Sequence, residues 1–391
     1  ASVILASLLS ACGHSRSETV SSGAAQEASG TTLRRDAAIA WTGDVGVVFG
    51  GVRADSTQAL IDGEIVDARG STLALTGPAP FSAGIPFPTA VSHGGKVYIG
   101  GVECERAVPG ERCEPASIAL AEFDPASRVW TRVDLPDGLA ALPQVSTDGS
   151  YRLPTYFEIL GVTLDGELVV DAGLGAGERY WVYEIATDSW ADLPPPPVEQ
   201  VEVEWIDGAR GATLGACLTS TGVLVVFEGT QPSNWQHPTG VDGVRTHVLD
   251  MSDRTWVTFP PDESVVTEDV PPVLDCAGPW AILTATEGQS TQLWQLDPAT
   301  TKAWTAVPSS PAIDAGALGQ FAPVQTIWGW TGSEIVVPTA SGTAPNLIYE
   351  PGGMTWRKGS IAPAGVARPP TTGGGGGHGV SGKRPGGVTA R

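Results

Sequence analysis

The stretch Phe123-Asp-Pro-Ala-Ser-Arg-Val-Trp130 decides the fold, because the chain repeats its pattern. Each copy begins with an aromatic or aliphatic residue, continues through turn-forming residues and reaches Trp after six intervening residues. Asp, Pro, Ser and Thr favour backbone bends, so the stretch predicts a β-hairpin whose second strand starts at the Trp. The other copies are Tyr183 to Trp190, Leu249 to Trp256 and Tyr349 to Trp356, and Leu296 to Trp304 has one extra residue in its turn.

A second pattern, an apolar strand that runs into Gly or another small residue, lies upstream of the hairpins and occurs six times. The copies are Val47 to Gly51, Val97 to Gly101, Leu168 to Gly173, Leu224 to Gly229, Trp280 to Ala285 and Ile335 to Ala340. Turns such as His93 to Gly95 precede most of these strands, and another apolar strand precedes each turn. Each repeat therefore holds about four strands over roughly 50 to 70 residues, a period typical of propellers.

A diglycine after an apolar strand, followed by Tyr and Trp about six residues apart, closely resembles the kelch motif. The resemblance covers about residues 33 to 368. It implies an all-β fold: a single six-bladed kelch-type β-propeller with four-stranded blades around a central channel. The alternatives are a seventh blade within Asp137 to Pro154 and a pair of β-sandwiches.

The repeats depart from the kelch pattern in two ways. The full diglycine is present at Gly50-Gly51 and Gly100-Gly101 alone, and the first repeat has Leu73 and Leu75 where a Trp is expected. Ring closure commonly completes a blade with a strand from the other end of the chain. We therefore expect Leu33 to Trp41 and Gln325 to Pro338 to be partners at the seam.

The N-terminal segment predicts export and anchoring. Residues 1–11 form an apolar run that is too short to span a bilayer and is read as the remnant of a signal peptide. Leu9-Ser10-Ala11-Cys12 resembles the bacterial lipobox, which implies cleavage before Cys12 and a diacylglycerol on its thiol. The alternative is a chance Cys after an ordinary signal peptide. The predicted location is therefore extracytoplasmic, as a membrane-anchored lipoprotein of the cell envelope.

The segments outside the propeller have compositions that do not favour a packed core. Residues 12–32 are rich in Ser, Gly, Ala, Thr and Glu and are expected to be a flexible tether. Residues 369–391 begin with a Pro and Gly run and are expected to be a disordered tail. The propeller is thus assigned to residues 33–368.

Four further cysteines suit an oxidising compartment. Cys104 and Cys113 bracket one loop and predict a local disulfide, while Cys217 and Cys276 stand at comparable points of neighbouring repeats and predict a second. A metal site is the competing interpretation. No CxxC occurs and the five His are far apart in sequence, so no metal is expected.

The net charge and the length of the chain restrict the fold and the classes of partner that it can bind. The net charge is −21, from 43 acidic and 22 basic residues, and such a field repels nucleic-acid phosphates. With 391 residues and 41% hydrophobic content, the chain is long enough for a substantial core. We expect a monomer that does not bind nucleic acid and reaches the membrane through its lipid.

Two connections between the second and third strands of a repeat are unusually long: Val102 to Ser117 and Thr230 to Val244. The symmetry of a propeller places both on one face, with Leu174 to Arg179 and Ser341 to Asn346 completing the rim. The second long connection carries Trp235, Gln236 and His237, which we take as candidate binding residues because loops on rigid scaffolds often carry function. Neutral insertion is the alternative.

No catalytic residue can be named. The galactose-oxidase type of kelch enzyme needs a Cys cross-linked to Tyr plus His ligands to copper, and no such set can be traced among six Tyr and scattered His. No GxSxG or EF-hand calcium loop occurs. Without a traceable cofactor, we expect a lipid-anchored envelope protein that binds a protein or glycan. The alternative is a carbohydrate-active hydrolase or lyase, which a carboxylate cluster or a carboxylate–His pair at the channel mouth would favour.

Overall fold

A computed structural model describes the chain in fifteen segments. They are residues 34–35, 37–43, 45–53, 58–67, 72–104, 117–140, 155–174, 178–198, 214–229, 243–266, 272–287, 290–308, 329–330, 333–337 and 347–358. Nearly all the regular secondary structure in these segments is β-strand, as the sequence predicts.

Six four-stranded antiparallel sheets, numbered here in chain order, account for most of the strands. The first contains β2 (Ala38–Thr42), β3 (Val45–Phe49), β5 (Gly63–Asp67) and β6 (Thr72–Leu75); the second β7 (Thr89–His93), β8 (Lys96–Glu103), β9 (Ser117–Asp124) and β10 (Val129–Arg132); the third β11 (Thr155–Val162), β12 (Glu167–Leu174), β13 (Glu178–Glu184) and β14 (Ser189–Asp192). The fourth contains β15 (Leu214–Leu218), β16 (Val223–Gly229), β17 (Val244–Asp250) and β18 (Thr255–Thr258); the fifth β19 (Val273–Ala277), β20 (Trp280–Glu287), β21 (Ser290–Leu296) and β22 (Thr305–Ala306); the sixth β23 (Gly329–Trp330), β24 (Ile335–Val337), β25 (Leu347–Glu350) and β26 (Thr355–Lys358).

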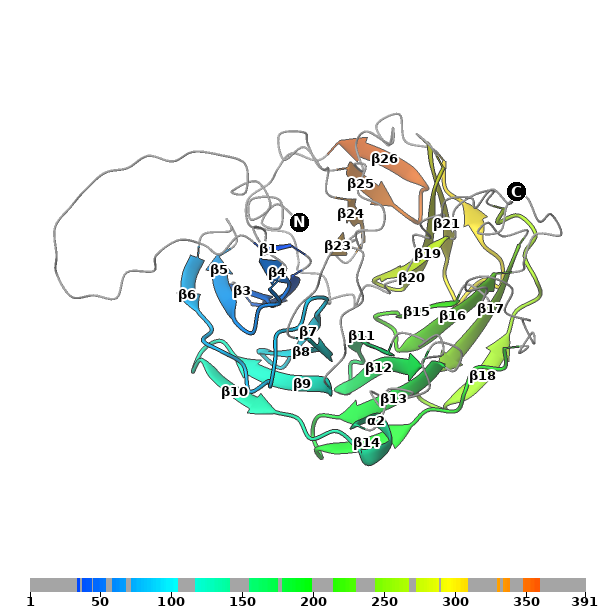
Figure 1. Cartoon of the computed structure of the whole chain (residues 1–391). Helices are drawn as coiled ribbons and strands as arrows, with labels where there is room; N and C mark the ends of the chain where they lie inside the picture. The colour runs from blue at the N-terminus through cyan, green and yellow to red at the C-terminus, as the bar shows by residue number, and fades with distance from the viewer. Residues whose placement is uncertain are drawn as a thin grey trace, which may run out of the picture.

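The sheets follow one another around a common centre, which is the arrangement of a β-propeller (Figure 1). From the first sheet to the fifth, the first strand of each sheet contacts the first strand of the next. Every sheet pairs strands from one continuous stretch of chain. The expected seam, with strands from both chain ends in one blade, is therefore wrong: β2 belongs to a complete first sheet, and β24 belongs to a complete sixth sheet.

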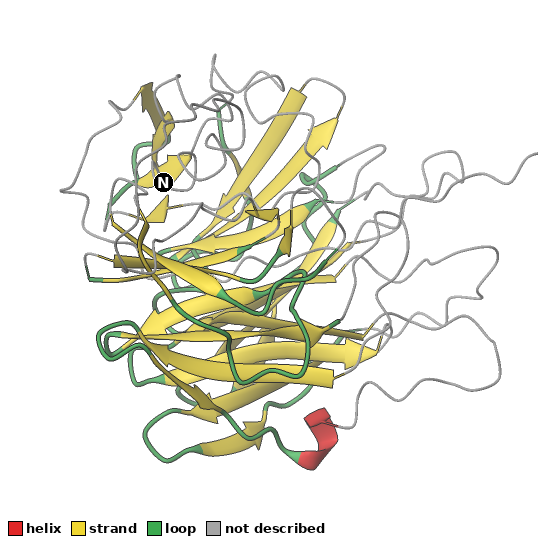
Figure 2. Cartoon of the chain, turned by 60° about the vertical axis from the view of Figure 1, so that its left-hand side comes forward, coloured by secondary structure: helices red, strands yellow, loops and turns green. Residues whose placement is uncertain are grey.

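Two short elements stand apart from these sheets. β1 (Arg34–Arg35) pairs with β4 (Val52–Arg53) in a two-stranded ladder. The helix α2 (Asp137–Ala140) lies at the outside of the stacked sheets (Figure 2). A Cβ on its Gly138 would lie 3.3 Å from the Trp181 ring, so the helix packs against the third sheet. Among the described segments, no helix is long and apolar enough to cross a membrane.

The core consists of layers between neighbouring sheets. Successive side chains of a strand point to opposite faces, so each strand contributes to two layers. In β8, Val97 and Ile99 pack against the first sheet, whereas Tyr98 packs against the third. The described residues form five such hydrophobic clusters, one between each consecutive pair of sheets.

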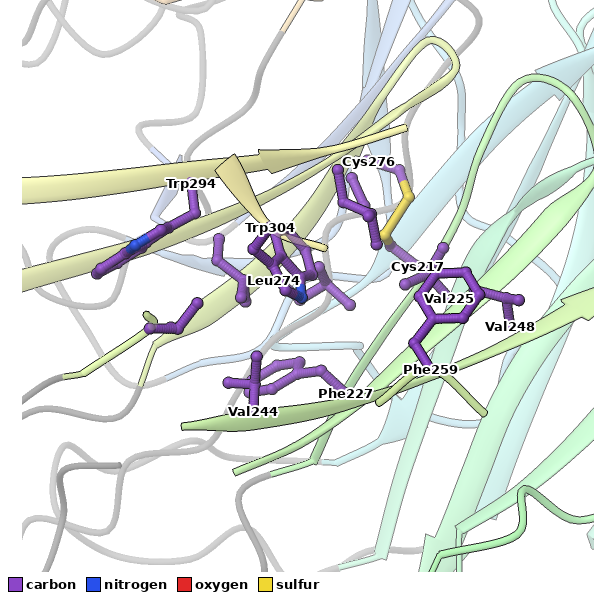
Figure 3. Packing of buried hydrophobic residues seen from close by; sticks show 14 of the residues in the cluster. Cys217, Val225, Phe227, Val244, Val248, Phe259, Leu274, Cys276, Trp294 and Trp304 are labelled. Atoms are coloured by element: carbon purple, nitrogen blue, oxygen red, sulfur yellow. A yellow bond between two sulfur atoms is a disulfide. The ribbon is translucent and has the colours of Figure 1, made fainter. Parts of the chain in front are cut away.

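The layer between the fourth and fifth sheets contains a disulfide (Figure 3). Cys217 on β15 and Cys276 on β19 are bonded with their Cα atoms 5.5 Å apart, the pairing that the sequence predicts. Phe227, Leu274 and Trp304 belong to the same cluster as the bond. The disulfide therefore links the first strands of two neighbouring sheets.

The repeated Trp stretch joins the third and fourth strands of a sheet, as predicted. In each copy without an extra residue, the Trp lies directly opposite the residue that opens the stretch: Trp130 opposite Phe123, Trp190 opposite Tyr183, Trp256 opposite Leu249 and Trp356 opposite Tyr349. The residue two positions before the Trp has a positive φ in every one of these turns: Arg128 (60°), Asp188 (52°), Arg254 (55°) and Met354 (49°). The six-residue spacing is thus set by a turn that closes through one left-handed residue.

The acidic residue at the start of the turn caps backbone donors. Asp124 Oδ1 accepts the Ala126 N–H at 2.8 Å, and the Ser127 hydroxyl donates to Asp124 Oδ2 at 2.8 Å. These bonds, the Ser127 bond foremost, hold the pKa of Asp124 below its usual value. Asp recurs here because it stabilises the bend through its own side chain.

Each of these Trp residues also bonds to the preceding sheet, through a contact we call the Trp latch. The indole N–H donates to a carbonyl just after the fourth strand of that sheet: Trp130 to Thr76 at 3.2 Å, Trp190 to Asp134 at 2.8 Å, Trp256 to Pro194 at 2.8 Å and Trp356 to Pro308 at 2.9 Å. The Trp side chains thus bridge neighbouring sheets, and the polar tip of each ring adds a directional bond.

Two sheets differ from this rule. In the fifth sheet, where the turn has one more residue, Trp304 is buried and donates to the Thr246 hydroxyl at 2.8 Å. In the first sheet, Leu73 and Leu75 stand in place of the Trp and are 55% and 57% exposed. The two repeats whose sequences depart from the Trp pattern are therefore the two described sheets without a Trp latch.

Candidate functional site

Most of the predicted site residues cannot be placed. Cys12, Cys113, Trp235, Gln236 and His237 lie outside the described residues. Cys104 is described and is disulfide-bonded, with a partner outside the described segments. The structure does place the strands that begin and end the two long connections.

The chain topology puts the long connections at the same end of their sheets. Residues 104–116 follow β8 and residues 230–243 follow β16, each the second strand of its sheet. In a four-stranded antiparallel meander, every connection from second to third strand leaves from the same end. We call this end the long-loop face.

A buried carboxylate lies at the foot of the first long connection, by which we mean the strand ends that the connection joins. Glu103, the last residue of β8, is fully buried and accepts hydrogen bonds from the backbone N–H groups of Ser82 and Ala83 and from the Ser117 hydroxyl. The Cys104 N–H donates to the Gly84 carbonyl at 2.8 Å. A buried carboxylate is stable when such donors compensate its lost hydration. Both ends of the connection are thus fixed to the segment that precedes the second sheet.

That segment is joined in turn to the first sheet. Gly51 N–H donates to the Ile85 carbonyl at 2.9 Å, and Ile85 N–H donates to the Leu60 carbonyl at 3.1 Å. A Cβ on Gly84 would lie 2.4 Å from the Ala59 carbonyl, so no larger residue fits there. The described backbone at this part of the long-loop face is a continuous hydrogen-bonded mesh.

The foot of the second long connection has a different polar group. Glu228 Oε2 lies 3.6 Å from Arg245 Nη1 and 3.6 Å from His247 Nε2, and His247 Nδ1 lies 3.0 Å from the Thr258 hydroxyl. We call these four residues the His247 cluster. His247 is fully buried and Glu228 is 5% exposed. Burial lowers the pKa of His247, and the Arg245 guanidinium lowers it further.

The His247 cluster faces the third sheet. Its neighbours on the same side of β16 and β17, Val226 and Leu249, belong to the layer between the third and fourth sheets. By strand alternation, Glu158 and Asp171 of the third sheet point into the same layer, beside the Tyr180 of that cluster. This layer therefore carries charge, whereas the layer between the fourth and fifth sheets is apolar at its centre.

The opposite end of the sheets has short turns and a groove between the third and fourth sheets. It is lined by Thr163, Leu164, Asp165, Glu167, Thr221, Gly222, Asp250, Met251 and Ser252. Leu164 is 85% exposed, and Arg254 bridges the same two sheets by an ion pair to Glu167 at 3.0 Å. Leu164 provides a reference position on the face opposite the long loops.

The Glu228–His247 pair of the His247 cluster is not an open catalytic site. Glu228 and His247 form a carboxylate–His pair, but both side chains are buried, so a substrate does not reach them in this conformation. Within the described segments, no group of three His, Cys, Asp or Glu side chains is placed to hold a metal ion.

Comparisons with known proteins do not assign a family. No family model matches the chain, and no curated protein matches it. Among solved structures, it is similar to the tricorn protease, with 12% identity and a TM-score of 0.41 over 83% of this chain and 26% of that one. It is also similar to TolB from Acinetobacter baumannii, with 10% identity and a TM-score of 0.36 over 82% of this chain and 65% of that one. The chain thus spans less than two thirds of either protein.

Proposed function

We propose that this chain is a lipid-anchored protein of the bacterial cell envelope, a closed six-bladed kelch-type β-propeller that binds a protein or a glycan through its long-loop face. The observation that carries the proposal is the rigid foot of the connection after β8, where Glu103 and the disulfide-bonded Cys104 hold both ends. A long loop on a fixed base is typical of recognition surfaces, because the scaffold pays little entropy when a ligand binds.

The envelope location is supported by the cysteines. Cys217 and Cys276 form a disulfide in the core, and Cys104 is also bonded. Disulfides persist in oxidising compartments and are rare in the cytosol. The lipobox resemblance at Leu9 to Cys12 adds the anchor.

The six-bladed ring is supported by the number and order of the sheets. The described residues hold six four-stranded sheets, and the first strands from the first sheet to the fifth contact in succession. The Trp latch recurs from sheet to sheet with the spacing of the kelch-like pattern.

The test compares variants of the full chain made soluble by Cys12→Ser. Each is used as bait in envelope extract: the parent, Trp235→Ala, and a variant with residues 105–116 replaced by Gly-Gly and with Cys104→Ser to avoid a free thiol. Leu164→Ala, on the opposite face, is the matched control. We expect at least one protein or glycan that the parent and the control retain and the loop variants lose. Equal recovery of every partner by all four baits would contradict the proposal.

A further inference from the structure

The layer between the third and fourth sheets holds a buried histidine whose surroundings oppose a second positive charge. The His247 ring is fully buried, and within the described segments its Nε2 has no hydrogen-bond partner, although it lies 3.6 Å from Glu228 Oε2. Its Nδ1 is occupied by the Thr258 hydroxyl at 3.0 Å. The neutral imidazole can therefore stay in the closed layer, where the hydrogen bond to Thr258 compensates the burial of Nδ1.

Protonation would place two cations beside one carboxylate. Arg245 Nη1 already lies 3.6 Å from the same Glu228 oxygen that faces His247. An imidazolium formed there would be desolvated and would repel the guanidinium. The attraction of Glu228 offsets part of this cost, whereas burial and then the Arg245 guanidinium lower the pKa of His247.

The ionisable groups that face this ring come from both sheets. Glu228 and Arg245 lie on the fourth sheet with His247 itself. Glu158 of β11, Asp171 of β12 and Tyr180 of β13 point into the layer from the third sheet. The two carboxylates favour a proton on the ring and so limit the size of the effect, but they do not relieve its burial.

We propose that the His247 cluster makes the contact between the third and fourth sheets sensitive to acid. When His247 takes up a proton, the ring is more stable in water than in the layer, so the ends of β16 and β17 at the long-loop face separate from the third sheet. The closed contact is complete above the pH at which a free histidine titrates, about 6.5, and weakens as the pH falls below it. Acidic surroundings would thereby loosen the ends of β16 and β17, between which the second long connection runs.

The test is hydrogen–deuterium exchange of the Cys12→Ser full chain between about pH 5 and pH 7.5, corrected for the intrinsic exchange rate. One-proton linkage predicts that the opening constant of amides in β16 and β17 rises by up to about tenfold per pH unit below about 6.5. Amides in β8 and β9, which lie two sheets away, are expected to show no such rise. A flat profile in β16 and β17 would overturn the proposal.

Two variants assign the effect to His247. His247→Gln keeps a polar partner for Thr258, cannot take up the proton and is expected to abolish the acid-dependent opening. His93→Gln, at the end of β7, is the matched control and is expected to keep it. An unchanged profile in His247→Gln would overturn the proposal.

If His247→Gln does not fold, an NMR titration of the His247 ring in the wild-type chain tests the proposal instead. Protonation below about pH 6.5 in step with the opening of β16 and β17 would support the proposal. Protonation without that opening would refute it.

Discussion

Replacing Cys217 and Cys276 together by Ala should strongly destabilise the protein. The disulfide joins residues 59 positions apart, across the first strands of the fourth and fifth sheets. The chain-entropy model assigns about 4 kcal/mol to closing a loop of that length. Both cysteines are buried in the cluster around Trp304, so some packing is also lost. Double substitution is used because a single change leaves a free thiol.

The assay is equilibrium unfolding in guanidinium chloride, followed by tryptophan fluorescence. Trp294 and Trp304 lie in the same cluster as the disulfide and report on this layer directly. The comparison variant is Cys104→Ala with Cys113→Ala, whose predicted bond closes a much shorter loop and should contribute about 2.5 kcal/mol. A loss below about 1 kcal/mol for the Cys217 and Cys276 variant, or a loss no larger than that of the comparison variant, would refute the reasoning.

Three further predictions concern the latch, the turn and the anchor. Trp256→Phe removes the indole N–H that bonds Pro194 and should cost about 1–2 kcal/mol in the same unfolding assay; a neutral result would show that the Trp acts by ring packing alone. Arg128→Asn should stabilise by about 0.5 kcal/mol because Asn tolerates the left-handed φ of 60° that Arg128 adopts, whereas Arg128→Ala, which keeps the strain, should not. Cys12→Ser should abolish labelling by radioactive palmitate in a bacterial host and release the protein from the membrane fraction; retained labelling would place the lipid elsewhere.

The hairpins were predictable because their signal is local. A six-residue spacing from Phe123 to Trp130 requires a tight turn, and the structure pairs those two residues directly. The extra residue before Trp304 also had a consequence, since that Trp is buried and bonds the Thr246 hydroxyl. The local sequence pattern determines the hairpin, and the hairpin directs the Trp side chain toward the preceding sheet.

The two diglycines look alike in sequence but have different physical reasons. Gly50 and Gly51 directly follow β3 and have positive φ values of 63° and 81°. Gly100 and Gly101 lie inside β8, where a Cβ would come within 2.5 Å of Phe157 and Ile85, respectively. One pair permits a turn and the other permits close packing, a distinction that depends on residues far away in the chain.

The polar groups at the feet of the long loops were not predictable. Glu103 and Glu228 each lie near the end of an apolar strand. An acidic residue at that position predicts only that the strand leaves the core there. Their roles depend on Ser82 and Ala83 in one case and on Arg245 and His247 in the other, all brought close by the sheet pairing or by the contact between sheets. The one local signal was an acidic residue directly before Cys104.

The central claim is that the long-loop face binds a partner in the cell envelope. Photo-crosslinking in living cells tests it most directly, with a photoreactive residue in place of Trp235 in one strain and Leu164 in another. The account predicts a discrete crosslinked adduct from position 235 and none above background from position 164. Adducts from position 164 alone, or from neither position, would contradict it.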